Sequence, residues 1–414
     1  MNILMLLYKD IHYDARVQRE ALALAEIGHI VNIACVREYR EEPPLFHENV
    51  HIHRVDISVK KAKNALAIKD SSINNGISLK KMITKIIRNP YIKVVKDYIA
   101  YFEFFKKVSQ LFEGKKIDVI HAHDLNTLWQ GKMLKKLLKC KLVYDSHELF
   151  NEMAGRNRVD RKAGYFVEGR LIKSIDYFIT VNEEMAKQFT ILYGQMPVKI
   201  VQNIPMIQND TETTSSFLRE KYQLSPEDII LFYQGGLNPE RGIEECVYTL
   251  DLLPNHYKLI LLGSGRIEAK LRELVDQLKL NNRVFFHEQV PASKVSWFTN
   301  QADVGLVMYR NTSKNNYYST PNKIFEYMQS GIPTIASNHP GKSYIVETYK
   351  TGICCEEDPK DIKEAIEKVV HDYNFYRSNC LRARETFTWD NEKENLVSLY
   401  RELSTYPVTV GERS

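Results

Sequence analysis

The chain has 414 residues, of which 44% are hydrophobic and 26% are charged, and its formal net charge is +5. This composition is typical of an ordinary globular protein of two or three domains, and a charge this mild does not by itself indicate nucleic-acid binding. No apolar run reaches the roughly 18 residues of a membrane-spanning helix. The six cysteines lack zinc or disulfide spacing, so we expect a reduced, cytoplasmic compartment.

Short apolar segments alternate with amphipathic segments along the first half of the chain. The segment Gln18–Gly28 has an apolar helical face that includes Ala21 and Leu24, and Gly28 ends it. Strands are predicted at Ile3–Leu7, Ile30–Val36, Val50–Val55, Val119–His121, Lys141–Tyr144 and Tyr177–Val181. Such alternation predicts a parallel sheet with helices on both faces.

Polar side chains follow several of these strands. They are Asp14 and Arg16 in the first loop, His121, His123 and Asp124 in the segment Asp118–Asp124, and His147 and Glu148 in the segment Tyr144–Leu149. The carboxyl ends of parallel strands form one crevice, so these groups are candidates for ligand contacts. We interpret His147 and Glu148 as acceptor contacts or as groups that deprotonate a hydroxyl, with a capping and turn cluster as the alternative.

Lys and Arg greatly outnumber Asp and Glu between residues 60 and 116. The segments Leu79–Ile87 and Tyr91–Phe105 mix lysines with apolar residues, and an amphipathic basic helix can lie on anionic lipid. This tract therefore indicates either peripheral membrane contact or a solvated insertion in the first lobe. No recognised nucleic-acid-binding module is present, so no nucleic-acid partner is expected.

The strand and helix alternation restarts after Pro197. Strands are predicted at Lys199–Gln202, Ile229–Tyr233, Lys258–Leu262, Arg283–Phe286, Val304–Val307 and Thr334–Ala336. The prediction is an α/β protein of two Rossmann-like, doubly wound lobes that face each other across a cleft. Residues 1–197 form the first lobe, residues 198–385 the second, and residues 386–414 a terminal helix at Asp390–Ser404 followed by a loose tail.

A glycine pair follows the strand at Ile229–Tyr233. Gly235 and Gly236 let the backbone approach a ligand closely, and Arg241 at the start of the next helix can fork onto phosphate oxygens. The alternative interpretation is an ordinary turn beside a surface arginine.

The most informative segment is Ser319–Ser337, where Ser319 or Thr320 is expected to cap a helix that opens near Pro321. The N-terminus of a helix suits a diphosphate. Lys323 adds a positive charge, and Glu326 can accept two hydroxyl hydrogen bonds, as a ribose requires. The alternative is a local Lys–Glu pair of little energetic value.

The Ser319–Ser337 segment resembles the nucleotide-sugar signature of the GT-B glycosyltransferases, in particular the retaining family 4, and the resemblance covers nearly the whole chain. It implies that Glu326 binds the ribose and that amides around Asn322 and Lys323 face the diphosphate. It implies that Arg241 also binds the diphosphate. Tyr318 stands where the family often has a second Glu that touches the donor sugar, so Tyr318 is the predicted donor contact at that position, and Gly236 stands where the family often has an Arg.

The same resemblance assigns further positions. Gly263 and Gly265 line the donor site, and the base lies against the loop Phe286–Val290, with uracil as the commonest case. His123 lies in the cleft beside the donor sugar, and Asp124 orients it or binds the acceptor. The terminal helix packs back across the first lobe.

The predicted function is a glycosyltransferase that moves a hexose from a nucleotide diphosphate sugar, UDP-linked in the commonest case, to a saccharide or lipid-linked acceptor. Such an enzyme retains anomeric configuration and serves surface polysaccharide or glycolipid synthesis at the inner face of the membrane. His123, Arg241 and Lys323 are the predicted catalytic residues, with no protein nucleophile and no metal or other cofactor. The alternatives are a sugar-nucleotide epimerase or phosphorylase on the same fold, or a non-catalytic binding protein, which the residues at Tyr318 and Gly236 suggest.

Overall fold

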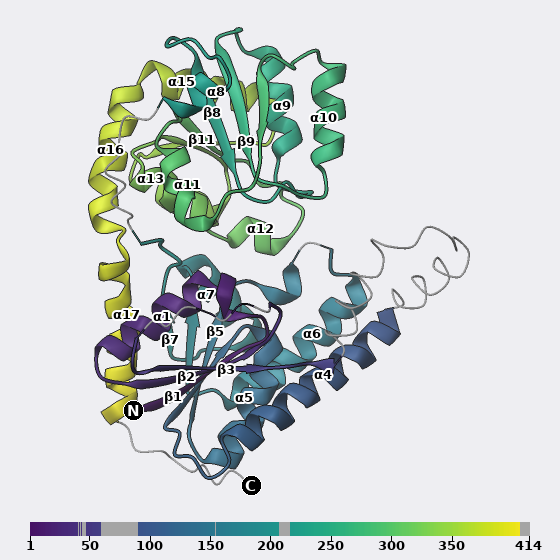
Figure 1. Cartoon of the computed structure of the whole chain (residues 1–414), viewed down its shortest axis with the longest axis vertical. Coiled ribbons are helices and arrows are strands. Elements are labelled where there is room, and N and C mark those ends of the chain that lie inside the picture. Colours follow the sequence, from purple (N-terminus) through teal and green to yellow (C-terminus); the bar gives the residue numbers. More distant parts are fainter. Residues whose placement is uncertain are drawn as a thin grey trace.

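The computed structural model describes residues 1–39, 41, 43, 47–58, 90–153, 155–206 and 216–405, without the side chains of Tyr13 and of residues 90–95. Two α/β lobes are stacked along the long axis of the molecule (Figure 1). This arrangement confirms the predicted fold class. The predicted amphipathic segment Leu79–Ile87 and the tail from Pro407 lie outside the described residues.

The N-terminal lobe contains a seven-stranded parallel sheet in the order β3-β2-β1-β4-β5-β6-β7. The strands are β1 (Asn2–Leu7), β2 (Ile30–Val36), β3 (Val50–Val55), β4 (Val119–His123), β5 (Lys141–Ser146), β6 (Tyr177–Thr180) and β7 (Val198–Ile200). The central strands are buried on both faces, as the near-continuous apolar runs Ile3–Leu7 and Ile30–Val36 require.

Helices cover both faces of this sheet. They are η1 (Ile11–Tyr13), α1 (Ala15–Glu26), α4 (Pro90–Leu111), α5 (Leu125–Leu138), η2 (Phe150–Glu152), α6 (Arg158–Leu171), η3 (Ile172–Ser174) and α7 (Glu183–Tyr193). Several begin at a side-chain cap: Asn182 Oδ1, for example, accepts a hydrogen bond from Met185 N at the start of α7.

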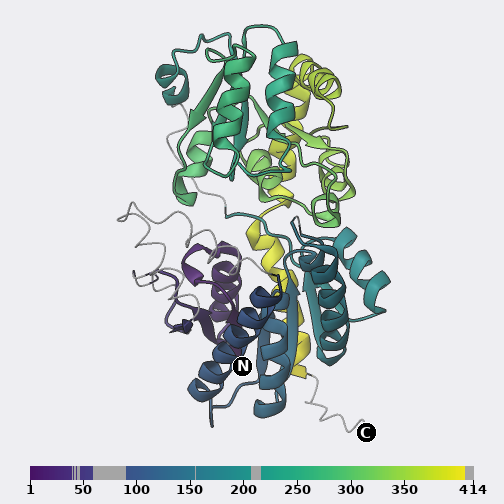
Figure 2. The same ribbon diagram turned by 90° about the vertical axis from the view of Figure 1, so that its right-hand side faces the viewer.

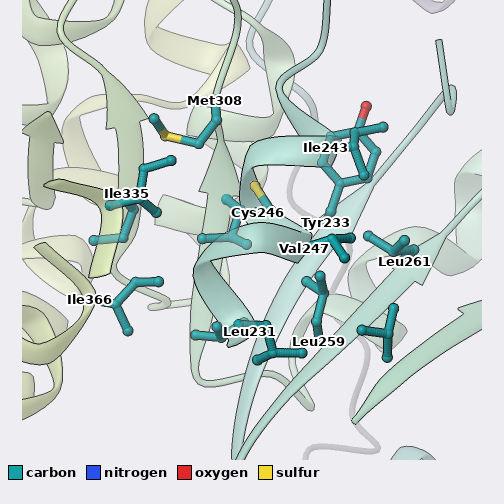
Figure 3. Close-up of a cluster of buried hydrophobic side chains, with 14 of the residues drawn as sticks. Leu231, Tyr233, Ile243, Cys246, Val247, Leu259, Leu261, Met308, Ile335 and Ile366 are labelled. Carbon is teal, nitrogen blue, oxygen red and sulfur yellow. The ribbon is translucent and has the colours of Figure 1, made fainter. Parts of the chain in front are cut away.

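The C-terminal lobe has a six-stranded parallel sheet in the order β10-β9-β8-β11-β12-β13. Its elements are α8 (Phe217–Lys221), β8 (Ile229–Gln234), α9 (Ile243–Leu252), β9 (Tyr257–Leu262), α10 (Glu268–Gln277), β10 (Val284–His287), α11 (Ala292–Thr299), β11 (Val304–Val307), α12 (Lys314–Tyr318), α13 (Asn322–Gln329), β12 (Thr334–Ser337), α14 (Pro340–Val346), β13 (Gly352–Cys355), α15 (Pro359–His371) and α16 (Tyr373–Thr386). One face of the sheet packs Leu231 and Leu259 against Val247 of α9 and shares a core with Ile366 of α15 (Figure 3). This rigid core fixes the loops that follow β8, β9 and β11.

The last helix, α17 (Trp389–Thr405), returns from the second lobe to the first (Figure 2). Its residues Leu396, Leu399, Tyr400 and Leu403 are buried in the core that α1 forms with the N-terminal sheet. The predicted return of the terminal helix to the first lobe is therefore confirmed.

Two local predictions are wrong. Val198–Ile200 does not begin the second lobe, because it pairs with β6 at the edge of the N-terminal sheet, with Phe178 opposite Val198. The first lobe therefore extends past residue 197. At the donor helix, neither Ser319 nor Thr320 is the cap: α13 begins at Asn322 with Pro321 in the cap position, and no side chain closes that end.

Candidate functional site

A cleft of about 880 Å³ lies between the lobes, at the carboxyl ends of both parallel sheets. Residues from both lobes line it. From the first lobe come Lys9, Asp14, Ala15, Arg16, Asp124, His147, Glu148 and Phe150, and from the second come Gln234, Gly235, Gly236, Arg241, Gly263, Tyr309, Ser319, Asn322, Lys323 and Glu326 among others. The structure thus brings most of the predicted site residues into one space.

Two cations of the C-terminal lobe gather around one aromatic ring. The guanidinium carbon of Arg241 lies 4.3 Å from the ring centre of Tyr309, and Lys323 Nζ donates a hydrogen bond of 3.3 Å to the Tyr309 hydroxyl. Lys323 also lies over the ring of Tyr233, at 4.9 Å. Aromatic faces hold the cations without neutralising them, so both charges remain available to an anion in the cleft. Tyr309 was not predicted, because a lone Tyr after a strand carries no pattern.

Backbone rather than side chains forms the part of the wall beside these cations. Gly235 and Gly263 have φ angles of +117° and +143°, which L side chains rarely adopt. A Cβ atom at Gly263 would lie 2.1 Å from the Gly235 carbonyl oxygen, so the two loops can touch only because residue 263 is a glycine. Gly236 also lines the cleft. Gly265 does not: a Cβ atom there would meet the Leu237 carbonyl at 2.2 Å, behind the wall, which corrects its predicted role.

Glu326 is positioned by a chain of hydrogen bonds from neighbouring elements. The Thr299 hydroxyl donates to Gln234 Oε1 at 2.6 Å, which turns the Gln234 amide nitrogen toward Glu326 Oε2 as a donor. Burial raises the pKa of Glu326, and Gln234 and Lys323 oppose that rise. The carboxylate keeps its remaining acceptor capacity toward the cleft. Gln234 was missed by the sequence analysis, although it ends the strand before the glycine pair.

The beginning of α13 faces the cleft through Asn322 and Lys323. Tyr318 does not face it. Its side chain packs against the core of the first lobe, and its carbonyl accepts a hydrogen bond of 2.8 Å from Asn182 Nδ2. The prediction that Tyr318 binds the donor is therefore wrong in this structure: Tyr318 ends α12 and forms part of the contact between the lobes, while Ser319 lines the cleft.

A buried lysine holds α12 and the residue that follows it through hydrogen bonds to their backbone. Lys342 on α14 is fully buried, and its ammonium donates hydrogen bonds to the carbonyls of Asn316 and Ser319, the latter at 3.2 Å. Burial lowers the pKa of Lys342 to about 7. Lys342 follows β12 at the carboxyl end of the sheet, and this position is the sequence signal that could have placed it near the site.

The wall of the first lobe is made of paired charges. Lys9 Nζ lies 2.7 Å from Asp14 Oδ2, and His147 Nδ1 lies 3.6 Å from Asp124 Oδ2. Burial opposes the charged imidazolium, but Asp124 and Asp145 outweigh it and raise the pKa of His147 to about 9. His147 is therefore a cation at neutral pH.

Asp124 holds an unusual backbone conformation for a side chain of its type. Its φ is +62° and its ψ is 165°, a region otherwise adopted by glycine that costs about 1–3 kcal/mol. The surrounding hydrogen bonds keep it there, since Asp124 Oδ1 accepts the backbone N–H of His147 at 3.1 Å and Asp124 N donates to the Asp145 carbonyl at 2.8 Å. Glu148 lines the cleft beside it, and burial raises the pKa of its carboxyl, with Asp124 adding to the rise. This pair combines a fixed carboxylate with one that takes a proton more readily.

His123 is not in the cleft. As predicted, its ring faces the same side of β4 as His121, and the two rings stack with centres 4.3 Å apart. That side is the interior, where both imidazoles are fully buried and His123 Nδ1 lies 3.2 Å from His147 Nε2. Burial lowers the pKa of His123 to about 3. The predicted direct contact of His123 with the donor sugar is therefore wrong in this structure, because His147 stands between it and the cleft.

Behind His147 lies a buried network of ionisable groups. One ligand atom each from Glu20, His121, His123 and Asp145 lies within 4.8 Å of the others, a spacing that can hold a metal ion. The guanidinium of Arg16 already occupies the acidic side, with Arg16 Nε 2.9 Å from Glu20 Oε1 and Nη2 3.0 Å from Asp145 Oδ1. Because this fixed cation contacts Glu20 and compensates the charge of Asp145, we interpret the cluster as an ion-pair network. The Tyr400 hydroxyl of α17 closes it, 2.9 Å from His121 Nδ1.

Comparisons with known proteins agree with this geometry. Residues 214–386 match the family of glycosyl transferases group 1, and residues 13–203 match the glycosyl transferase 4-like domain. An uncharacterized glycosyltransferase of Methanocaldococcus jannaschii is 25% identical over 79% of this chain and 85% of its own length. A GDP-mannose-dependent alpha-(1-6)-phosphatidylinositol dimannoside mannosyltransferase of Mycobacterium tuberculosis is 21% identical over 70% of this chain and 75% of its own length. The solved structure of Anabaena HepE in complex with UDP has a TM-score of 0.70 at 14% identity, covering 97% of this chain and 100% of that one.

Proposed function

Because the chain belongs to the GT-B glycosyltransferases, with a family 4-like first domain and a group 1 second domain, we propose that it transfers a hexose from a UDP-linked donor to a lipid-linked or saccharide acceptor. The observation that carries the proposal is the grouping of Arg241, Lys323 and Glu326 on one wall of the cleft. The acceptor groups His147 and Glu148 line the opposite wall.

The donor wall supplies what a nucleotide diphosphate needs. Two cations and the open end of α13 suit the diphosphate, and Glu326 suits the two hydroxyls of a ribose. Gln289, Val290 and Pro291 line the same wall beside Glu326, where a base would lie. Uracil is favoured by the fold neighbour whose structure contains UDP.

The mechanism we propose needs two contributions from the protein. Arg241 and Lys323 stabilise the negative charge that develops on the leaving diphosphate, in a cleft from which bound substrates exclude water. The acceptor hydroxyl lies on the side of Glu148 and His147, and the departing phosphate takes its proton on the same face of the sugar. This course retains the anomeric configuration, uses no protein nucleophile, and requires no metal ion.

Nucleotide release from a panel of UDP-hexoses and GDP-mannose, with and without lipid-linked acceptors, tests the proposal. We expect release that depends on both a particular donor and an acceptor, that survives a metal chelator, and that falls about 100-fold in Glu326→Ala. NMR of the product should show the anomeric configuration of the donor.

Two outcomes would favour the other candidates. Conversion of one sugar nucleotide into another without any acceptor would indicate an epimerase. Nucleotide binding with no turnover of any donor and acceptor pair would indicate a non-catalytic binding protein. Tyr318 does not line the donor site, so the usual contact with the donor sugar is missing at that position among the described residues. The second outcome is therefore worth testing.

A further inference from the structure

A second cavity of about 930 Å³ lies in the N-terminal lobe, between α4, α5 and α6. This volume is in the range of pockets that bind small organic ligands. The lining is mostly apolar and aromatic: Tyr98, Ile99, Tyr101, Phe102, Leu125, Trp129, Phe150, Ala163, Val167 and Leu171, with Asp97, Asn126, Gln130, Gly155, Arg156, Asp160 and Gly164. We call it the α4–α6 groove.

Helix α4 is apolar on two faces, although one face is enough to pack on its own lobe. Phe104 and Val108 are fully buried in the core. On the groove side Tyr98, Ile99 and Phe102 are 61%, 56% and 57% exposed. A surface helix normally has polar residues opposite its core face, so this apolar edge indicates a surface that contacts something apolar. No helix within the described ranges is both long and apolar enough to cross a bilayer.

The groove adjoins the cleft between the lobes. Phe150 lines both cavities, and the guanidinium of Arg156 lies over its ring at 5.0 Å from the centre. A molecule that passes Phe150 has one end in the groove and the other beside Glu148 and His147. The groove therefore lies next to the side of the cleft where we place the acceptor, with Phe150 between them.

The floor of the groove holds an amide without a protein partner. Gln130 is 1% exposed, and within the described part of the chain neither its Oε1 nor its Nε2 has a hydrogen-bond partner. The same holds for Asn126 Oδ1, one turn earlier on the same face of α5. A buried amide left unpaired costs about 1–3 kcal/mol, so these groups favour a ligand that brings oxygen atoms to this floor. Because α5 begins directly after Asp124, the amides lie toward the end of the groove that is nearer the cleft.

The outer face of α6 is basic. Arg158, Lys162 and Arg170 on α6 are exposed, whereas on the described part of α4 the exposed charges, Lys106 and Asp97, have opposite signs. Cations beside an apolar groove complement an amphiphile with an anionic head group, and they attract the surface of an anionic membrane. An uncharged apolar ligand would gain nothing from them.

We propose that the α4–α6 groove binds the hydrocarbon chain of a lipid-linked acceptor, whose phosphate linkage lies near Arg156 and Gln130 and whose hydroxyl group to be glycosylated enters the cleft past Phe150. This inference rests on the proposed transferase function and specifies its acceptor as an anionic, single-chain amphiphile. In this arrangement the hydrocarbon chain of the ligand contacts Trp129, Phe102 and Val167.

Binding of dansylated farnesyl phosphate to the full-length protein tests the groove directly. We expect saturable binding that unlabelled farnesyl phosphate competes away. Ala163→Phe fills the groove from an exposed helical position and should weaken binding at least about tenfold, because the added ring takes the space of the chain. Ala269→Phe, the same change at an exposed position of α10 in the other lobe, should leave it unchanged.

A second pair of variants distinguishes binding of the probe in the groove from its nonspecific adsorption to the protein surface. Phe102→Glu should also weaken the binding of dansylated farnesyl phosphate, whereas Phe375→Glu, at a residue 50% exposed on α16, should not. If Phe102→Glu weakens binding and Ala163→Phe does not, the probe adsorbs to the outer surface and the groove assignment is wrong. Thermal unfolding of each variant shows whether it is folded.

UDP binding, measured on the same samples, keeps this test distinct from the test of the transferase function. Wild-type protein that binds UDP but shows no saturable farnesyl phosphate binding would overturn the groove and leave the function standing. Farnesyl phosphate binding that Ala163→Phe abolishes, in a protein that turns over no donor, would support the groove and refute the function.

Discussion

The two walls of the cleft use charge in opposite ways. On the C-terminal wall, Arg241 and Lys323 contact aromatic rings, and among the ion pairs of the described residues neither has a carboxylate partner. On the N-terminal wall the charges are paired, as in Lys9 with Asp14 and His147 with Asp124. A diphosphate has a fixed negative charge, which unpaired cations suit. A hydroxyl acceptor is neutral, and a wall of paired charges positions it without offering an excess of either sign.

The largest expected effect is a loss of stability when the buried ion pair of Arg16 and Asp145, behind the N-terminal wall, is broken. Asp145→Asn removes a buried carboxylate that Arg16 contacts through Nε and Nη2 at 3.1 and 3.0 Å. Breaking a buried ion pair leaves a charge uncompensated and costs about 3–5 kcal/mol, so thermal unfolding should move to clearly lower temperature. An unchanged melting temperature would mean that the N-terminal wall does not depend on its pairing.

The next effect is on turnover, at the unpaired cations of the C-terminal wall. Arg241→Ala removes a charge that faces the leaving diphosphate, so steady-state turnover should fall by about 10²- to 10³-fold. The melting temperature should hardly change, because Arg241 has no ion pair with any residue that the structure describes. Arg266→Ala, at an exposed arginine just after the Gly263 loop, is the control and should retain activity. Equal losses in both variants would remove the distinction between catalytic and peripheral cations.

The two walls also differ in how far the sequence predicts them. Arg241, Lys323 and Glu326 were located because each stands in a contiguous segment whose turn and helix signals fix the geometry. The N-terminal wall comes from separate loops, and its buried network joins residues as distant as Arg16 and Tyr400, which no local pattern connects.

The errors have local physical causes. His123 was placed in the cleft by the family resemblance, whereas β4 continues to His123 and carries its ring into the interior. The lobe boundary was misplaced because β7 has only three residues, and a short edge strand gives too little periodicity to be assigned to a sheet. The fold class, in contrast, followed from alternation repeated along the whole chain.

A smaller effect should appear in the pH dependence of stability. The folded-state pKa of His147, about 9, lies above the value of about 6.5 for a free imidazole. Its contribution is therefore fully present below pH 6.5 and is lost as the pH rises through 9, by about 3 kcal/mol. Chemical denaturation across this range should show the decline in wild type and a shallower one in His147→Gln. Identical slopes would mean that Asp124 and Asp145 do not hold a cation at the cleft.

The smallest effect is expected at Glu20, the other carboxylate on Arg16. Burial raises the pKa of Glu20, with Arg16 opposing the rise, whereas burial at Asp145 is outweighed by neighbouring charges, above all that of Arg16, which hold its pKa well below the usual range, so Glu20 takes a proton far more readily than Asp145. Near pH 5, Glu20→Gln replaces one neutral group by another of the same shape and should change the free energy of unfolding by less than about 1 kcal/mol.

The sign of the Glu20→Gln effect at higher pH makes the comparison with Asp145→Asn decisive. A raised folded-state pKa means that wild type loses stability as the pH rises above about 4.5, because the unfolded chain ionises first. Glu20→Gln cannot ionise, so its stability relative to wild type should increase over that range, whereas Asp145→Asn should remain destabilised throughout. Neutralising Glu20 and neutralising Asp145, which both contact the Arg16 guanidinium, would then have opposite effects on the free energy of unfolding. If Glu20→Gln instead loses stability with rising pH, both carboxylates carry charge and the network holds one more negative charge than this structure implies.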